Sequence, residues 1–388
     1  MPGLNKMNNI PIYLQTLMIQ LQDWTINRIA SDIAKSYQIS SSAEYLMTTL
    51  SELSMFEVDL KTEIQRILKM SDKKINKIFQ DAAESSYLHD TRVFKGEIPF
   101  VPFEQNEFMQ NLVESTINIT QGEIRNITRS MGFAYRVNDQ LYYKPIATFY
   151  HEQLDSAVYK VAAGVQTFDE AVTDAVKKMA NSGLKAVTYE TGHVSRIDVA
   201  ARRAMMGGMR YLVNAKSERN AQQMGVTVYE ISWHGGHRPS HAWGGRRFDI
   251  TGIHYPTERQ LYAKYPSPKG EIGTLDDYNC YHEKYAVFPE SPPTFTDEEL
   301  DEMEKNELVE KEFEGKKFNA YKARQHQRYL ERLMRKQHSI VVGYKGAGVP
   351  DLLKLEKIKF EQLISEYRRF CDKFDFSMEM ARVYTGIL

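Results

Sequence analysis

The sequence predicts an α+β fold with a mostly helical N-terminal region, a small mixed α/β motif domain and a charged helical C-terminal region. Three observations lead to this expectation. Apolar residues recur at helical spacing through the first part of the chain, a β-rich stretch precedes a segment dense in His, Arg, Trp and Gly, and the charges of the last part are sorted by sign. A chain of 388 residues is longer than the length that usually folds around a single hydrophobic core. We therefore expect three regions, at residues 1–184, 185–290 and 291–388.

The N-terminal region is predicted to be a set of amphipathic helices. Between residues 12 and 36, Leu14, Leu17, Leu21 and Ile29 fall on one helical face. Further helices are expected over the following ranges: 42–69, 72–86, 104–131, 146–164 and 167–180.

Turn and capping residues set the limits of these helices. Residues 94–102 (FKGEIPFVP) should form an extended connector, because they hold two prolines and a glycine. Gly132 should end the helix before it, and the short stretch after it should be irregular. Thr167 and Glu170 have the spacing of a capping box, which opens the next helix.

The motif domain should combine short strands with one long helix. Residues 185–190 (KAVTYE) favour a strand. Ser195 is placed to cap a helix over residues 196–224, which Gly225 should end. Residues 226–233 (VTVYEISW) alternate and are rich in β-formers, so a strand should lead into the segment that follows.

Charge sorting dominates the C-terminal region. The segment PESPP at residues 289–293 marks its start, and Thr296–Glu299 has the pattern of a capping box. Acidic residues prevail over 297–314 and basic residues over 316–336, an order that complements a helix dipole. With Gly315 between them, the two runs should form a solvated hairpin of two helices.

The basic run has a second interpretation, as a face that contacts DNA or an acidic protein partner. Its candidate contact residues are Lys316, Lys317, Lys322, Arg324, Arg328, Arg332, Arg335 and Lys336. After it, a loop at residues 343–350 (GYKGAGVP) and a last amphipathic helix over 351–374 are expected.

Composition narrows the classes of function. The formal net charge of −1 gives no overall positive field for nucleic acid. The first residues, MPGLNKMNNIPIYLQTLMIQL, lack the pattern of a secretory signal, and no apolar run approaches the ~20 residues that span a bilayer. Two distant cysteines, Cys280 and Cys371, do not make a disulfide framework. We expect synthesis in a cytoplasm and no membrane anchor.

Residue types that bind metals or take part in catalysis are most concentrated in residues 231–249 (ISWHGGHRPSHAWGGRRFD), which hold His, Arg and Trp. A second concentration is NCYH, about thirty residues later, which holds Cys280 and His282. Imidazole and thiolate are preferred zinc ligands, and the candidate ligands are His234, His237, His241, Cys280 and His282. The segment lacks paired C-x-x-C spacing, and two glycines leave its backbone free to point these side chains apart. We therefore expect no metal and no other cofactor, with zinc as the alternative.

The same residues allow an enzymatic interpretation. Histidines beside arginines and a serine can form an acid–base couple with an anion clamp, as in a metal-independent nuclease. The catalytic candidates would then be His237, Arg238, Ser240, His241 and His282. A phosphate-binding glycine loop, a G-x-S-x-G elbow and an H-E-x-x-H pair are all missing from the sequence. Our preferred interpretation is a hydrogen-bonded structural core, in which no residue is catalytic.

The segment GHRPSHAWGGRRFD resembles the core motif of the phage minor capsid protein 2 family of tailed bacteriophages. Residues 197–210 (IDVAARRAMMGGMR) are similar to that family's arginine-bearing helix, and NCYH is similar to its N-C-R-H signature. Tyr281 stands where the family tends to have arginine. The resemblance covers roughly residues 10–290, and the matched positions are Arg202, Arg203, Gly236, Arg238, Pro239, Ser240, His241, Trp243, Gly245, Cys280 and His282.

This resemblance implies a structural minor capsid protein of the virion, made in a host bacterium's cytoplasm. It would bind the portal protein, the major capsid protein or both, near the portal vertex, with DNA as a further contact. Its role would lie in head morphogenesis or in genome packaging and delivery. The rival from another class is a nuclease or nucleotide-modifying effector that the virion carries.

Overall fold

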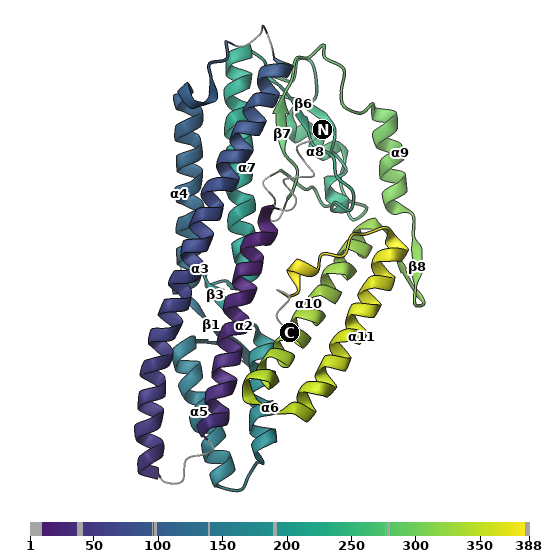
Figure 1. Ribbon diagram of the computed structural model, residues 1–388. Helices are drawn as coiled ribbons and strands as arrows, with labels where there is room; N and C mark the ends of the chain where they lie inside the picture. The colour runs from purple at the N-terminus through teal and green to yellow at the C-terminus, as the bar shows by residue number, and fades with distance from the viewer. Residues whose placement is uncertain are drawn as a thin grey trace.

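Long helices dominate the computed structural model, which describes residues 10–36, 42–94, 96, 99–138, 140–188, 192–275, 277 and 280–384 (Figure 1). Small antiparallel sheets are inserted between these helices. The described residues are 67% helical, which confirms the predicted α+β, mostly helical fold class. None of the described helices is both long enough and apolar enough to cross a membrane.

Four long helices form the body of the molecule: α2 (Ile10–Ser36), α3 (Ser42–Val93), α4 (Glu107–Arg129) and α7 (Ile197–Met224). They lie side by side, with α7 in contact with both α2 and α4 (Figure 1). The predicted break between residues 69 and 72 is wrong, because α3 is a single helix of 52 residues. Tertiary contacts override the weak helix formers there, since Asp72 accepts a hydrogen bond from Arg125 of α4 at 2.8 Å.

The first sheet has the strand order β2-β1-β3-β4, with β1 at Met131–Val137, β2 at Gln140–Pro145, β3 at Lys185–Val187 and β4 at Val194–Arg196. The stretch predicted to be irregular after Gly132 is instead the β1–β2 hairpin, and Gly132 itself lies in β1. Ser195 is not a helix cap, because it pairs with Ala186 across β3 and β4. The last two residues of the strand predicted over 185–190 lie outside the described residues.

Helices α5 (Ile146–Ala162) and α6 (Phe168–Ser182) follow the hairpin, and both were predicted. The capping box at Thr167 and Glu170 is confirmed, with hydrogen bonds in both directions between the two residues. The predicted connector at residues 94–102 has no helix or strand among its described residues.

The second sheet carries the motif. Strand β5 (Val228–Ile231) is central, between β6 (Arg247–Asp249) and β7 (Lys284–Ala286). The strand predicted over 226–233 is therefore confirmed, whereas β6, β7 and the short helix α8 (Glu258–Lys264) were not predicted. Strands of three residues are too short to show an alternating pattern.

The C-terminal part contains α9 (Asp297–Leu308), the hairpin β8 (Lys311–Phe313) and β9 (Lys316–Phe318), then α10 (Ala320–Ala347) and α11 (Pro350–Phe374). The predicted pair of helices around Gly315 is corrected by this hairpin, in which Gly315 has a φ of +76°. A left-handed residue suits a tight turn and not a helix interior.

Helix α10 continues through residues 343–347 of the predicted loop and ends at Ala347, with Gly348 as its C-cap. Gly343 and Gly346 lie inside the helix at positions where neighbouring helices leave no room for a side chain. A Cβ on Gly343 would lie 2.6 Å from Cγ1 of Val176 in α6. Helices α10 and α11 then form the antiparallel pair visible in Figure 1.

Three apolar clusters are found among the described residues. The largest contains residues of all the helices from α2 to α7 and also includes Ile340, Val342 and Tyr344 of α10. The second lies between α10 and α11, and the third lies under the motif sheet around Tyr229, Trp243 and Phe248. Because α10 contributes to the largest cluster, the C-terminal region is held to the N-terminal helices by apolar contacts as well as by charge. The division of the chain at residues 184 and 290 stays a prediction.

Candidate functional site

The motif segment leaves β5 after Ile231, makes one 3₁₀ turn at Pro239–His241 and returns as β6. Gly236 and Gly245 have φ values of +73° and +81°, which favour glycine. A Cβ on Gly245 would lie 2.5 Å from Cδ2 of Leu300 in α9. These two glycines allow the loop to fold tightly and allow α9 to approach it.

Trp243 is the centre of the motif's apolar core and is fully buried. Its Nε1 donates a hydrogen bond to the backbone oxygen of Gly273 at 3.0 Å. Its ring lies 4.8 Å from the ring of His241, 4.8 Å from that of His282 and 4.9 Å from that of Tyr262, between centroids. The motif tryptophan therefore packs the two histidines in place.

Arg247 is buried and has partners on two segments. Its guanidinium donates to Glu230 of β5 at 2.9 Å and to the backbone oxygens of Ser291 and Pro292 at 2.7 and 3.0 Å. The prolines predicted to mark a region boundary are thus tied to the motif sheet.

Arg246 is also buried, and it points to α9. It donates to Asp297 at 2.7 Å and to Asp301 at 2.6 Å, while its guanidinium lies 4.2 Å from the ring centroid of Tyr265. Charge-assisted hydrogen bonds of this kind are about twice as strong as neutral ones. The acidic start of α9 therefore docks on the motif.

Three of the five candidate zinc ligands come together. Sγ of Cys280 lies 3.8 Å from Nδ1 of His241 and 3.5 Å from Nδ1 of His282. The three ligand atoms all lie within 4.8 Å of one another, and all three residues are buried. Burial, followed by the effect of the neighbouring imidazoles, lowers the pKa of His282 well below its ordinary value, and burial raises the pKa of the Cys280 thiol.

The other two candidate ligands are placed differently. His234 lies against His282, with ring centroids 4.3 Å apart, and burial lowers its pKa to about 4. His237 points away, to Glu304 of α9, with Nε2 to Oε1 at 2.8 Å. Burial acts to lower the pKa of His237, but its bonds to Glu304 and to the Arg238 backbone outweigh this and raise the pKa.

Most of the catalytic candidates are buried in the described part of the chain. His241 and His282 are only 2% and 1% exposed, and Ser240 is buried. Arg238 is partly exposed, and its Nη1 lies 4.0 Å from Oδ2 of Asp277. Pro239 occupies the first turn of the 3₁₀ helix, where its missing N–H costs nothing. Among the described residues, the two imidazoles are therefore shielded from solvent.

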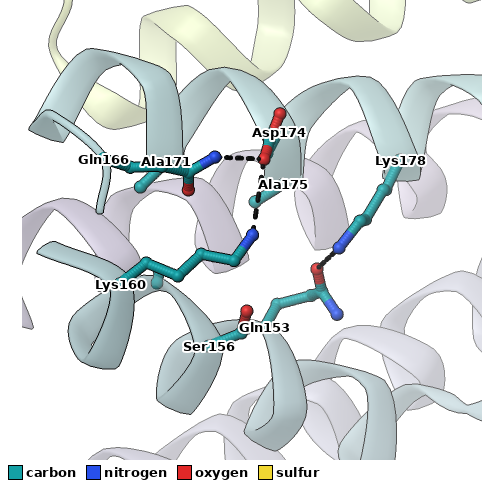
Figure 2. Close-up of a pocket in the computed structure, with 9 residues that line it drawn as sticks. Gln153, Ser156, Lys160, Gln166, Ala171, Asp174, Ala175 and Lys178 are labelled. Atoms are coloured by element: carbon teal, nitrogen blue, oxygen red, sulfur yellow. Dashed lines mark hydrogen bonds and ion pairs between the residues drawn. The ribbon is translucent and has the colours of Figure 1, made fainter. Parts of the chain in front are cut away.

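A small pocket between α5 and α6 is far too small for a substrate. Figure 2 shows its polar lining, where Gln166 donates to Asp174 at 2.8 Å and Lys178 to Gln153 at 3.2 Å. The cavity volume is about 10 Å³. That volume holds about one water molecule, so the pocket is not a candidate active site.

The two motif arginines of α7 have hydrogen-bond partners on different segments. Arg202 donates a hydrogen bond to the hydroxyl of Tyr281, and its guanidinium lies 5.1 Å from that ring's centroid. Arg203 donates to Oγ of Ser195 at 2.6 Å. Tyr281 therefore serves as a neutral partner for Arg202, at the position where the resemblance leads one to expect an arginine.

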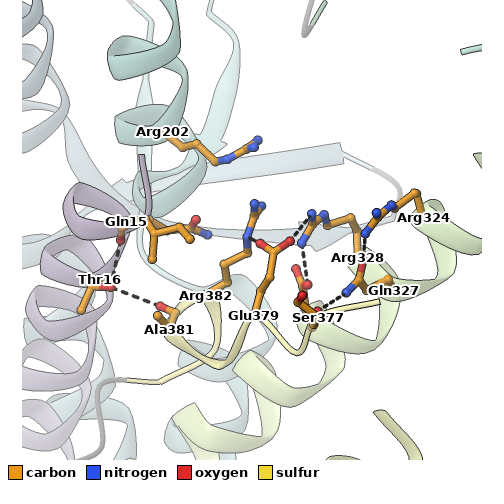
Figure 3. Close-up of polar contacts among 12 residues, drawn as sticks. Gln15, Thr16, Arg202, Arg324, Gln327, Arg328, Ser377, Glu379, Ala381 and Arg382 are labelled. Atoms are coloured by element: carbon orange, nitrogen blue, oxygen red, sulfur yellow. Dashed lines mark hydrogen bonds and ion pairs between the residues drawn. The ribbon is translucent and has the colours of Figure 1, made fainter. Parts of the chain in front are cut away.

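The predicted basic face is only partly exposed. Arg335 is buried, with its Nε 3.6 Å from Asp198 of α7. Arg328 donates to Glu331 at 2.6 Å and to Glu379 at 3.0 Å (Figure 3). The exposed members of the run are Lys316, Lys317, Lys322, Arg332 and Lys336, and Arg324 is half-buried.

Figure 3 also shows Arg382, which lies close to Arg328 and pairs with Glu379. Burial, together with the guanidiniums of Arg328 and Arg202, lowers the pKa of Arg382 to about 9. Arg328 and Arg382 both pair with the carboxylate of Glu379, so these two arginines take part in an ion pair within the fold.

Replacing Asp249 by Asn should make folding less stable at pH 7 by about 1–3 kcal/mol, since the carboxylate accepts charge-assisted bonds. The donors are Thr227, Thr251, Ile253 and His254 at 2.7–3.1 Å. Burial acts to raise the pKa of Asp249, but these bonds outweigh it and lower the pKa strongly.

A lowered carboxyl pKa stabilises the fold above the unfolded value of about 4 and loses this effect as pH falls toward the folded value. Urea unfolding should therefore show a gap between wild type and Asp249→Asn that is full at pH 7 and narrows below about pH 4. A gap that stays constant down to pH 3 would contradict this role.

Sequence reasoning missed the acidic partners of the motif, among them Asp277, Glu304 and Glu307. Asp277 accepts from His241 at 3.1 Å, and Glu307 accepts from the backbone nitrogen of Gly236 at 2.7 Å. Asp277 stands only three residues before Cys280, so its closeness to the signature was a usable signal. The glutamates of α9 gave no such signal, because they belong to a long acidic run.

Comparison with known proteins gives one match. A family model described as phage minor capsid protein 2 matches residues 5–372. The match extends the resemblance beyond residue 290, through the hairpin, α10 and nearly all of α11. No curated protein and no solved structure matches the chain.

Proposed function

We propose, from the premise that this chain belongs to the phage minor capsid protein 2 family, that it joins the portal protein or the major capsid protein in the head of a tailed phage. Family membership makes it a structural phage protein associated with other head proteins. The position at the portal vertex and the role in head assembly, packaging or delivery belong to the proposal.

The observation that carries the structural role is the use of the motif side chains within the fold. Trp243 is fully buried, Arg247 joins β5 to the PESPP segment, and Arg246 joins the loop to α9. Each of these side chains holds two parts of the chain together. The motif therefore builds a defined surface for docking, with its own polar groups directed inward.

The DNA contact is proposed for the exposed basic residues of β9 and α10. Lys316 and Lys317 lie on the hairpin, and Arg332 and Lys336 lie further along α10. All four are exposed. Lysine and arginine side chains that reach phosphates release counterions, and the resulting affinity falls steeply with salt.

Reversing Lys316, Lys317, Arg332 and Lys336 to Glu should weaken DNA binding and should reduce the slope of log affinity against log salt by about 3–4, roughly one for each phosphate contact. Fluorescence anisotropy with labelled duplex DNA at several salt concentrations measures this. The matched control reverses four exposed lysines of α3, Lys61, Lys69, Lys73 and Lys77. Equal losses in both variants would show a general charge effect and would contradict a specific DNA face.

The structural role also predicts that the isolated chain does not turn over nucleic acid or nucleotides. Wild type and His241→Ala should be equally inert toward RNA, DNA and NAD, with and without added zinc. Activity that the substitution abolishes would favour the virion-carried enzyme instead.

A further inference from the structure

We propose that His241, Cys280 and His282 bind one zinc ion, which fastens the motif loop to the segment that enters β7. The proposal replaces the sequence-based expectation of no cofactor, because the fold supplies the distances that spacing alone left open. Cys280 would bind as the thiolate, and its proton would pass to solvent when the ion enters. A water molecule would complete the tetrahedron, since three protein ligands and one open position are an established zinc arrangement.

The spacing of the ligand atoms fits a single tetrahedral ion. Zinc lies about 2.3 Å from a thiolate sulfur and about 2.0–2.1 Å from an imidazole nitrogen, so two such ligands on one ion are about 3.6 Å apart. The observed distances from Sγ of Cys280 are 3.5 Å to His282 and 3.8 Å to His241. Both sulfur-to-nitrogen distances are therefore close to what a bound ion requires, and the three ligand atoms all lie within 4.8 Å of one another.

A hydrogen-bonded cluster explains the same contacts less well. A neutral thiol has one proton and can donate to only one of the two Nδ1 atoms that face it. A single cation would give both Nδ1 atoms and the thiolate a strong partner at the same time.

Asp277 supplies the outer partner that zinc-binding histidines usually have. Its Oδ2 lies 3.1 Å from Nε2 of His241, and its Oδ1 accepts from Thr274 at 3.0 Å. A carboxylate on Nε2 holds the proton there and leaves Nδ1 free as a ligand. That nitrogen is the one that faces Cys280.

The neighbouring backbone is shaped around the same three side chains. A Cβ on Gly244 would lie 2.8 Å from Nε2 of His282, and a Cβ on Gly273 would lie 2.7 Å from Nε2 of His241. The indole of Trp243 stacks on the His241 ring and contacts the His282 ring at an angle of 52° between their planes. The imidazoles are therefore fixed before any ion binds, which lowers the ordering cost of coordination.

The other two histidines stay outside this set. His237 binds Glu304, and the His234 ring contacts the His282 ring with their centroids 4.3 Å apart. Since His241 and Cys280 are 39 residues apart, the ion would close a long loop within the motif domain. Such a bond would stabilise the fold.

The test is the zinc content of the full-length chain, purified without chelator and incubated with equimolar zinc before desalting. We expect about one zinc per chain by mass spectrometry of the metal. Cys280→Ser should lose most of it. Cys371→Ser is the matched control. Cys371 is the other cysteine, is also buried and lies in α11, which contributes no proposed zinc ligand.

A second variant covers the case in which Cys280→Ser fails to fold. Asp277→Asn keeps all three ligands and should weaken zinc binding by about 10–100-fold in competition with a chromophoric chelator. Cobalt loading gives an independent reading, a thiolate-to-cobalt absorption band that requires Cys280. Folded wild type without zinc, or equal zinc in wild type and folded Cys280→Ser, would overturn the proposal. Zinc content is measured on the isolated chain, so this result is separate from the role in the head.

Discussion

Replacing Arg247 by Ala should lower the free energy of unfolding by about 3–5 kcal/mol, the cost of removing one partner of a buried ion pair. The guanidinium is only 4% exposed and Glu230, its partner at 2.9 Å, is 7% exposed. The substitution leaves the carboxylate buried with Thr294 as its remaining described donor. It also frees two backbone oxygens of the PESPP segment.

Urea unfolding followed by circular dichroism and tryptophan fluorescence measures this loss. Arg259→Ala is the control, because Arg259 is exposed on α8, which contacts β6, and it should change stability by less than about 0.5 kcal/mol. Replacing both Arg247 and Glu230 by Met should recover part of the loss, since no charge is then left buried alone. Similar small effects for Arg247→Ala and Arg259→Ala would contradict a structural motif.

Replacing Asp198 by Ala should also lower the free energy of unfolding by about 3–5 kcal/mol. Asp198 stands at the start of α7, is 1% exposed and joins three elements. Its carboxylate accepts from Arg196 at 3.0 Å and from Gln15 of α2 at 3.4 Å, and it lies 3.6 Å from Arg335 of α10. The loss would leave Arg335 buried without its carboxylate.

Burial acts to raise the pKa of Asp198, but Arg196, Arg335 and the hydrogen bonds outweigh it and lower the pKa. The carboxylate is therefore charged at pH 7, where the full cost should appear. Arg66→Ala is the control, because it removes an exposed ion pair with Glu63 at 2.6 Å and should cost less than about 1 kcal/mol. If Asp198→Ala and Arg66→Ala unfold at the same urea concentration, the buried network does not hold α10 to the body.

The helices were predictable because apolar spacing and caps are local signals. The capping boxes at Thr167 and Thr296 are both present, and Gly225 ends α7 in a left-handed conformation. Three-residue strands such as β6 and β7 carry no such signal, because their pairing depends on contacts distant in sequence. The glycines in the last turns of α10 misled for the same reason, since the cause of their placement lies on α2 and α6.

The sequence identified which residues belong to the candidate site, but it did not show how they are arranged in space. The sequence shows that His241, Cys280 and His282 belong to two dense segments, but two glycines in the first leave their mutual orientation open. The structure separates His237 from that group and pairs it with an acidic residue of α9. It also assigns Arg335 to an internal ion pair, which no charge count could show.

Buried charged residues join the motif to the neighbouring helices and join α10 to the body of the molecule. Arg246 and Arg247 fasten the motif to α9 and to the segment before it, while Asp198 fastens α10 to α7 and α2. Charged groups that would be costly alone are paired at each junction. A head protein that must keep its shape against its neighbours gains a defined surface from such junctions.

The most direct test of this account is quantitative mass spectrometry of purified phage heads, with the amount of this chain compared with that of the portal protein. We expect the chain in a fixed ratio to portal in both empty and DNA-filled heads. Its absence from purified heads, while it is abundant in the infected cell, would contradict a structural role in the head.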